Sequence, residues 1–315
     1  QQAWNKSLDL SQRALLINSN LQSALVRIAR LNAGPLNNHQ RAMEFAQRAR
    51  KANPDDPYAT HILGKLAYTS AASASDFQWA HSLLSEASRR LTANPDVLFD
   101  YAKAAYAVGR TSDAVDAMQR VAQSQSANAT AARTFIELDS LLKNPAGAGN
   151  AGDLVQQTLK SDPAHLPGLM LSGHLQVQNG NLSDAQNTYE HVLKRYPAFW
   201  PVLKQLALLN FGNTNNAAKA YEYARLAREA APQDPDLARV LGWLEFDRGE
   251  YARAAQLLTE ARNANPNDTE TLYRLGIAQY RLRRIDQGKE TLSRALELAP
   301  ESALAAEARR LLDQE

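Results

Sequence analysis

Cysteine is absent from the 315 residues, which excludes disulfides, thiolate metal sites and cysteine nucleophiles. No apolar run is long enough to span a bilayer, and no run of like charge reaches five residues. The 35 basic and 33 acidic side chains leave a net charge of only +2. Such a balance argues against nucleic acid or an anionic membrane as the main partner. We therefore expect neither nucleic-acid binding nor direct membrane insertion.

Motifs for catalysis and cofactor binding are missing as well. The chain has no HExxH, GxSxG, GxxxxGK[ST] or GxGxxG segment. The six histidines are His39, His61, His81, His165, His174 and His191, and no two of them have the i, i+4 spacing of helical metal ligands. The sequence therefore predicts no catalytic residue, no metal and no cofactor, and we expect a protein that is not an enzyme.

A period near 34 residues is the dominant positive feature. Prolines recur 34, 35, 34 and 34 residues apart, at Pro163, Pro197, Pro232, Pro266 and Pro300. A period of this length is typical of helix-turn-helix repeat arrays. Such an array presents a long shared surface and not a catalytic pocket.

The positions that recur suit closely packed helix pairs. Two late repeats align at a leucine-glycine pair, Leu241-Gly242 on Leu275-Gly276. They also align at small or apolar positions further on, with Ala254, Leu258 and Ala261 falling on Gly288, Leu292 and Ala295. Small residues let two helix axes approach, and the proline after each second helix ends it. No repeat buries its apolar face alone, so neighbours must stack.

This pattern resembles the tetratricopeptide repeat family, with its leucine-glycine pair, its small alanine positions and its closing proline. The resemblance covers nearly the whole chain. It implies an all-α fold, a right-handed superhelical solenoid of about eight helix-turn-helix repeats. For function it implies a scaffold that binds other proteins.

The predicted organisation is a single solenoid over 1–315. An orphan second helix lies at 1–19 and a capping helix at 302–315, and between them the repeats lie at 20–56, 57–94, 95–128, 129–165, 166–199, 200–234, 235–268 and 269–301. We expect a longer inter-helix turn at Tyr68–Ser75. The fourth repeat has Phe135-Ile136 in place of leucine-glycine and a glycine-rich segment at 144–150, so we expect it to be the weakest; a domain boundary there is the alternative. The missing first helix at the start suggests a piece of a longer chain or a processed product.

The resemblance also implies where a partner binds, because in this family the first helix of each pair lines the concave face. The implied groove positions are Tyr58, His61, Lys65, Tyr68, Phe99, Lys103, Tyr106, Met170, His174, Lys204, Phe211, Arg239, Trp243, Phe246, Tyr273, Arg274, Ile277, Tyr280 and Arg281. The alternative is that aromatic residues such as Trp243 and Tyr280 pack between repeats as core. Lys204 and Arg274 match cationic positions with which some family members clamp a carboxyl terminus, but the asparagines of that clamp are absent.

Three functions remain open at this point. The first is a non-enzymatic scaffold that binds a protein or peptide segment in the groove. The second is an assembly or spacer module of a bacterial envelope or exopolysaccharide export machine, and the third is an accessory region of a larger enzyme. The absence of cysteine favours a location in the bacterial envelope or periplasm over the cytoplasm, and both stay open.

Overall fold

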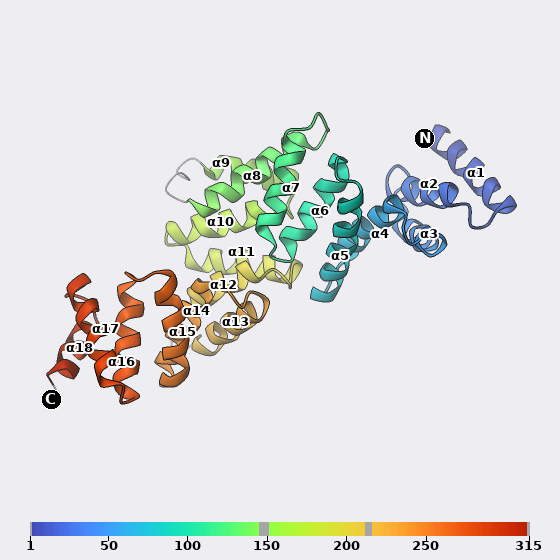
Figure 1. Cartoon of the computed structure of the whole chain (residues 1–315). Helices are drawn as coiled ribbons and strands as arrows, with labels where there is room; N and C mark the ends of the chain where they lie inside the picture. Colours follow the sequence, from blue (N-terminus) through green and yellow to red (C-terminus); the bar gives the residue numbers. More distant parts are fainter. Residues whose placement is uncertain (1, 145–150, 212–215, 314–315) are drawn as a thin grey trace. The chain divides into compact units, whose positions relative to one another are not determined.

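The computed structural model describes residues 2–144, 151–211 and 216–313, and all 18 regular elements in these ranges are α-helices (Figure 1). The prediction of an all-α fold is therefore confirmed. The chain divides into two compact units, 1–199 (unit 1) and 200–315 (unit 2). None of the helices in the described ranges combines the length and hydropathy that crossing a bilayer requires.

Consecutive helices pack as pairs along most of the chain. Unit 1 contains α1 (Gln2–Ile17), α2 (Gln22–Ala33), α3 (His39–Ala52), α4 (Pro57–Ser70), α5 (Ala74–Arg90), α6 (Pro95–Ala107), α7 (Thr111–Ala122), α8 (Ala129–Lys143), α9 (Ala151–Ser161), α10 (Leu166–Gln178) and α11 (Leu182–Arg195). Unit 2 contains α12 (Trp200–Asn210), α13 (Ala217–Ala230), α14 (Pro235–Asp247), α15 (Tyr251–Ala264), α16 (Thr269–Arg281), α17 (Ile285–Leu298) and α18 (Ala305–Leu312). Each repeat range expected from the sequence encloses two of these helices, and the division into repeats stays a prediction.

Short polar side chains followed by proline start several first helices. Asp56 accepts hydrogen bonds from the backbone amides of Tyr58 and Ala59, at 2.8 and 3.0 Å, and Pro57 then occupies the first turn of α4. Asn94 and Asp234 cap α6 and α14 in the same way. These residues satisfy amides that lack a partner inside the helix, and the proline contributes no amide that needs one.

The glycine of each leucine-glycine pair lies against a leucine of the second helix. A Cβ atom added to Gly276 would lie 2.6 Å from Cγ of Leu292, and one added to Gly242 would lie 2.9 Å from Cγ of Leu258. Real Cβ atoms do not come this close to carbon, so each glycine is required by the approach of the two helices. The leucine then fills the space that a larger residue would have taken.

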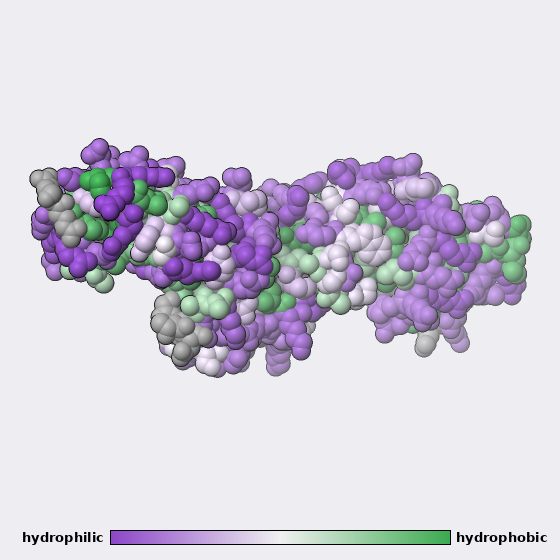
Figure 2. Space-filling view, turned by 90° about the horizontal axis from the view of Figure 1, so that it is seen from below, coloured by the Kyte–Doolittle hydropathy of each residue, from purple (hydrophilic) through white to green (hydrophobic). Residues whose placement is uncertain are grey.

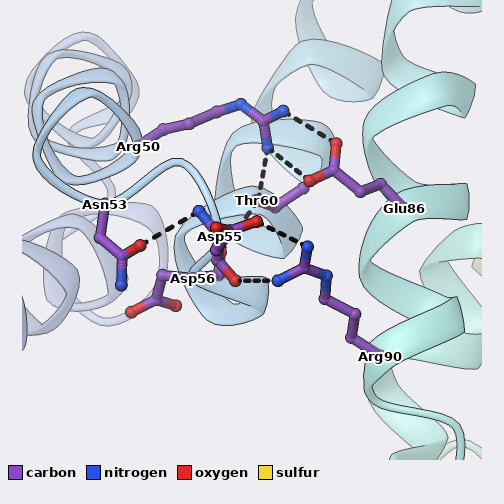
Figure 3. Close-up of polar contacts among 7 residues, drawn as sticks. All are labelled: Arg50, Asn53, Asp55, Asp56, Thr60, Glu86 and Arg90. Atoms are coloured by element: carbon purple, nitrogen blue, oxygen red, sulfur yellow. Dashed lines mark hydrogen bonds and ion pairs between the residues drawn. The ribbon is translucent and has the colours of Figure 1, made fainter.

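Ion pairs on the outer side of the pairs connect one repeat with the next. Figure 3 shows Arg50 of α3 reaching Glu86 of α5 with both terminal nitrogens, at 3.2 and 2.8 Å. In the same view Arg90 of α5 binds Asp55, in the turn before α4, at 2.6 Å. Because these side chains are partly exposed, each pair contributes little stability alone. Their geometry instead fixes how neighbouring second helices align.

An equivalent ion pair between successive second helices occurs in unit 2. Arg228 of α13 binds both carboxylate oxygens of Glu260 of α15, at 2.8 and 2.6 Å. Its other terminal nitrogen donates to the backbone oxygen of Asp234, at 2.8 Å. Arg228 and Arg50 both lie two residues before the last residue of their helices, so the contact belongs to a repeated position.

The prediction of a longer inter-helix turn at Tyr68–Ser75 is wrong. Helix α4 continues through Ser70 and α5 begins at Ala74, so the extra residues lengthen helices instead of a loop. Ser73 and Asp76 form a capping box that starts α5 at this point. The serines that suggested a loop therefore start a helix, because a serine at an N-cap is as favourable as one in a turn.

The fourth repeat is irregular in its packing. Residues 145–150 of the expected glycine-rich segment lie outside the described residues. Helices α8 and α9 meet α10 in one apolar cluster that includes Leu138, Val155 and Leu171. Ile136 stands at the position where other repeats have a small residue, and Phe135 before it is buried. The pair therefore lacks the close contact that Gly276 makes with Leu292.

Hydrophilic side chains cover most of the face in Figure 2, and hydrophobic ones form separate patches. At the end of α1 the side chains of Leu16 and Ile17 are 87% and 91% exposed. The remaining apolar residues lie mainly between helices, as stacking of neighbouring pairs requires.

Replacing Gly276 with alanine should destabilise unit 2. Helix propensity favours alanine by about 1 kcal/mol, but overpacking against Leu292 typically costs about 1–3 kcal/mol, so we expect a net loss of about 1 kcal/mol. Gly152→Ala is the matched control, because nothing lies within 4 Å of its added Cβ. Urea unfolding followed by circular dichroism checks both. Equal stabilisation by the two substitutions would show that the close contact is not limiting.

Amide hydrogen exchange should be faster in α8 and α9 than in α14–α17. The fourth pair lacks the small-residue contact, so we expect its opening free energy to be lower by about 1 kcal/mol or more. Exchange followed by mass spectrometry on peptides from the two segments measures this difference. Equal or stronger protection in α8 and α9 would contradict the expectation.

Candidate functional site

Three first helices of unit 2 lie in succession, and α14 contacts both α12 and α16. Side chains from the three helices form one surface, which we call the α12–α14–α16 face. Six of the groove positions expected from the sequence meet there: Lys204, Phe211, Arg239, Trp243, Phe246 and Arg274. All six are half-buried, so each contacts its neighbours and keeps part of its surface open to solvent.

Arg274 is the centre of this face. Its guanidinium carbon lies 5.7 Å from the ring centroid of Phe211, 5.4 Å from that of Trp243 and 5.7 Å from that of Phe246. The rings of Phe211 and Trp243 also contact each other, with centroids 5.4 Å apart. A cation held near aromatic faces is attracted by their negative potential. One arginine therefore joins Phe211, just after α12, and the aromatic side chains of α14 to α16.

The charge of Arg274 is balanced by two acidic neighbours. Its side chain is 11% exposed and forms ion pairs with Asp247 and Glu270. Burial lowers the pKa of Arg274, against the opposing effect of Asp247. Burial also raises the pKa of Asp247, against the opposing effect of Arg274. For both groups the loss of water on burial has a larger effect on the pKa than the attraction within the pair.

Other cations on the face are paired in the same manner. The ammonium of Lys204 lies 3.4 Å from Asp234 and 3.2 Å from Asp236. The guanidinium carbon of Arg239 lies 4.7 Å from the ring centroid of Trp243. The acidic partners were missed from the sequence, although acidic residues recur at the starts of successive first helices. That recurrence was the available signal.

Trp243 is held in a defined orientation. Its indole nitrogen donates to the hydroxyl of Thr271 at 3.3 Å, and that hydroxyl donates to Asp268 at 2.8 Å. The hydrogen-bonded chain satisfies the polar atom of the indole and leaves its ring for Arg239 and Arg274. An aromatic ring that is already oriented loses little entropy when a ligand packs on it.

Five of the expected groove residues lie in the core instead. Their exposures are 1% for Tyr106, 1% for Met170, 0% for Tyr273, 1% for Ile277 and 8% for Tyr280. The hydroxyl of Tyr273 donates to the backbone oxygen of Ala299 at 2.6 Å, and the ring of Tyr280 fills the space beside Gly288. A first helix packs against its own second helix and against both neighbouring pairs, so its buried stripe is wider than one face.

In unit 1 another set of expected positions gathers around an acidic residue. Nε2 of His61 lies 2.8 Å and the ammonium of Lys65 lies 3.2 Å from the same carboxylate oxygen of Asp100. Burial alone would raise the pKa of Asp100, but the hydrogen bond from His61 and the charge of Lys65 lower it. Tyr58 is 42% exposed and has the guanidinium of Arg30 5.7 Å from its ring centroid.

The remaining expected positions do not join these groups. Arg281 is 45% exposed and binds Glu307 at 2.9 Å. His174 is half-buried, and burial lowers its pKa. Tyr68, Phe99 and Lys103 line a cavity of unit 1. Over the described ranges, no three histidine, aspartate or glutamate side chains are grouped so as to hold a metal ion.

Comparison with known proteins agrees with this architecture. Two tetratricopeptide repeat family models match residues 205–269 and 245–312. The peroxisomal targeting signal receptors of Komagataella phaffii and Komagataella pastoris are each 26% identical over 176 residues, covering 52% of this chain. The match spans 30% of each receptor's length.

Among solved structures, the hetero-tetramer Cut9-Hcn1 of the APC/C has a TM-score of 0.55 and 15% identity, covering 93% of this chain and 70% of that one. YrrB, titled as a TPR protein with an unusual peptide-binding site, has a TM-score of 0.27 and 12% identity, covering 95% of this chain and 97% of that one. The two family matches show tetratricopeptide repeats over residues 205–312, and the preceding part of the chain has a similar paired-helix architecture.

Proposed function

We propose that this chain is a non-enzymatic scaffold that binds a peptide or protein segment on the α12–α14–α16 face. The observation that carries the proposal is the cluster of half-exposed rings held around Arg274. Aromatic and arginine side chains are enriched among the residues that dominate binding energy at protein interfaces. The curated relatives, which are named as receptors for a targeting signal, support the same class of function.

The charge pattern indicates what kind of segment would bind there. Lys204, Arg239 and Arg274 each have an acidic neighbour within 4 Å, so the face has little uncompensated charge. Affinity would then come mainly from apolar and aromatic contact, with the ion pairs setting orientation at the rim. We therefore expect the affinity to depend only weakly on salt.

A spacer that only separates other components does not need this arrangement. Such a role would be met by fully buried packing between repeats, without oriented rings that remain open to solvent. The half-exposed Trp243 and Phe246 favour binding over spacing.

Removing the indole of Trp243 should weaken binding by about 2 kcal/mol or more, which is roughly thirtyfold in affinity. A peptide selected on the intact protein from a displayed random library supplies the ligand, and calorimetry measures its affinity. Gln256→Ala on α15 is the control, because Gln256 is exposed and lies outside the face.

Thermal melts of the same variants separate binding from folding. A loss of affinity by Trp243→Ala with an unchanged melting temperature supports the proposal. Trp243→Ala could instead lower only the melting temperature, with the folded fraction binding as tightly as the unaltered protein. In that case the ring belongs to the core and the proposal is wrong at this site.

A further inference from the structure

Unit 1 contains a cavity of about 290 Å³ that is separate from the face described above. It lies between α4, α6, α8 and α9 and the turn that precedes α10. Tyr68, Phe99, Tyr106 and Phe135 supply aromatic walls, and Lys103 and His165 supply nitrogen atoms. An aromatic cavity with a few polar groups is the usual form of a small-ligand site.

The walls are fixed by contacts within unit 1. The ring of Tyr106 stacks on Phe199 with centroids 5.5 Å apart, and meets the edge of Phe135 at 5.0 Å. The hydroxyl of Tyr196 donates to the backbone oxygen of Ala164 at 2.8 Å. The turn after α11 therefore packs into the unit and holds the turn before α10. The cavity is what this packing leaves open, and it exists without a ligand.

Arg195 strengthens this packing from the other side. One of its terminal nitrogens donates to the backbone oxygen of Ala71 at 3.0 Å, across 124 residues of sequence. Its guanidinium carbon also lies 5.4 Å from the ring centroid of Phe77 and 5.1 Å from that of Tyr196. The side chains that bound the cavity thus have little freedom to collapse into it.

Lys103 brings to the wall a positive charge that forms no ion pair among the described residues, although Asp162 also lines the cavity. Its ammonium lies 6.0 Å from the ring centroid of Phe99, and in the described part of the chain no carboxylate lies within 4 Å of it. Lys65 on the neighbouring helix, by contrast, is paired with Asp100 at 3.2 Å. A half-buried ammonium beside aromatic rings attracts an anion more strongly than one in open water.

His165 provides a neutral hydrogen-bond donor beside this charge. Its Nδ1 accepts the backbone amide of Gly168 at 3.2 Å and so caps α10. Burial lowers the pKa of His165 to about 4, with Asp162 and Lys103 acting in opposite senses. The ring is therefore uncharged at neutral pH, and its proton must lie on Nε2 because Nδ1 is an acceptor.

The size of the cavity limits the ligand. A dry cavity of about 150 Å³ accommodates benzene, so about twice that volume holds one ring with a short polar substituent. We propose that the cavity binds an aromatic carboxylate, with the carboxylate at Lys103 and His165 and the ring among Phe99, Tyr106 and Phe135. The ligand is either a free aromatic acid or the carboxyl-terminal residue of a peptide, which share this chemistry.

Asp162 allows the charge of the ligand to be tested. Its carboxylate is also on the wall, where it accepts the amide of Ala164 at 3.2 Å. A bound carboxylate would be repelled by Asp162 and attracted by Lys103, whereas a bound amine would respond in the opposite sense. Neutralising each residue in turn therefore reveals the charge of the ligand.

Fluorine NMR of three small probes with the full chain performs the test. The probes are para-fluorophenylacetate, its neutral amide para-fluorophenylacetamide, and para-fluorobenzylamine. We expect the acid to bind about tenfold more tightly than the amide, because only the acid forms a charge-assisted hydrogen bond. The amine should bind least. Equal binding of acid and amide, or tighter binding of the amine, would overturn the proposal.

Variants then locate the site. Lys103→Met should remove the preference for the acid, Lys103→Arg should retain it, and Asp162→Asn should tighten binding of the acid about threefold. Lys160→Met is the matched control, because Lys160 is exposed on α9 and does not line the cavity. Circular dichroism melts show that each variant is folded. An unchanged acid preference in folded Lys103→Met, or an equal loss in Lys160→Met, would place binding elsewhere and refute the assignment.

A peptide pair distinguishes the two sources of the ligand. The tripeptide acetyl-glycyl-glycyl-para-fluorophenylalanine is compared with its carboxyl-terminal amide. If the peptide acid binds as tightly as para-fluorophenylacetate and its amide does not, the site accepts a carboxyl terminus. If only the free small acid binds, the site accepts a small molecule. These measurements are independent of Trp243, so they stand or fall separately from the proposal for unit 2.

Discussion

The close approach of paired helices at small residues is the contact on which the rest of the structure depends. Where Gly276 faces Leu292 and Gly242 faces Leu258, the two helices of a pair meet with no side chain holding them apart. This spacing positions each first helix against the next, and α12, α14 and α16 consequently bring their side chains onto one surface. The cluster around Arg274 is thus a product of backbone packing several residues away from it.

The α12–α14–α16 face of unit 2 and the cavity of unit 1 differ in how their cations are balanced. In unit 2 the cations of the α12–α14–α16 face are balanced by acidic residues, and burial shifts the pKa values of Arg274 and Asp247 against their charged forms. In unit 1, Lys103 lies at an aromatic wall with no carboxylate at ion-pair distance among the described residues. A surface of paired charges suits recognition by shape, and an ammonium without an ion-pair partner in a cavity suits recognition of a negatively charged group.

The sequence was sufficient to predict local structure. It was insufficient to predict which sides of a helix are covered by neighbouring helices. The 34-residue period predicted repeats beginning at 57 and 235, and α4 and α14 start at Pro57 and Pro235. Tyr273 was wrongly placed in the groove, and for Tyr280 the alternative of a core position agrees with its burial. A first helix has neighbours on several sides, and periodicity reveals only one buried stripe. The role of His165 was not foreseen, because its cavity is assembled from residues about 100 positions apart.

The hydrogen bond from Arg195 to Ala71 gives unit 1 a long-range contact that a simple repeat array lacks. In a linear stack each repeat contacts only its neighbours, and unfolding can begin at any repeat and spread toward either end. A contact that spans 124 residues closes a loop, so most of the unit must be ordered before the contact forms. Opening of α4 and α5 is then coupled to release of the turn after α11, a coupling that a row of independent pairs lacks.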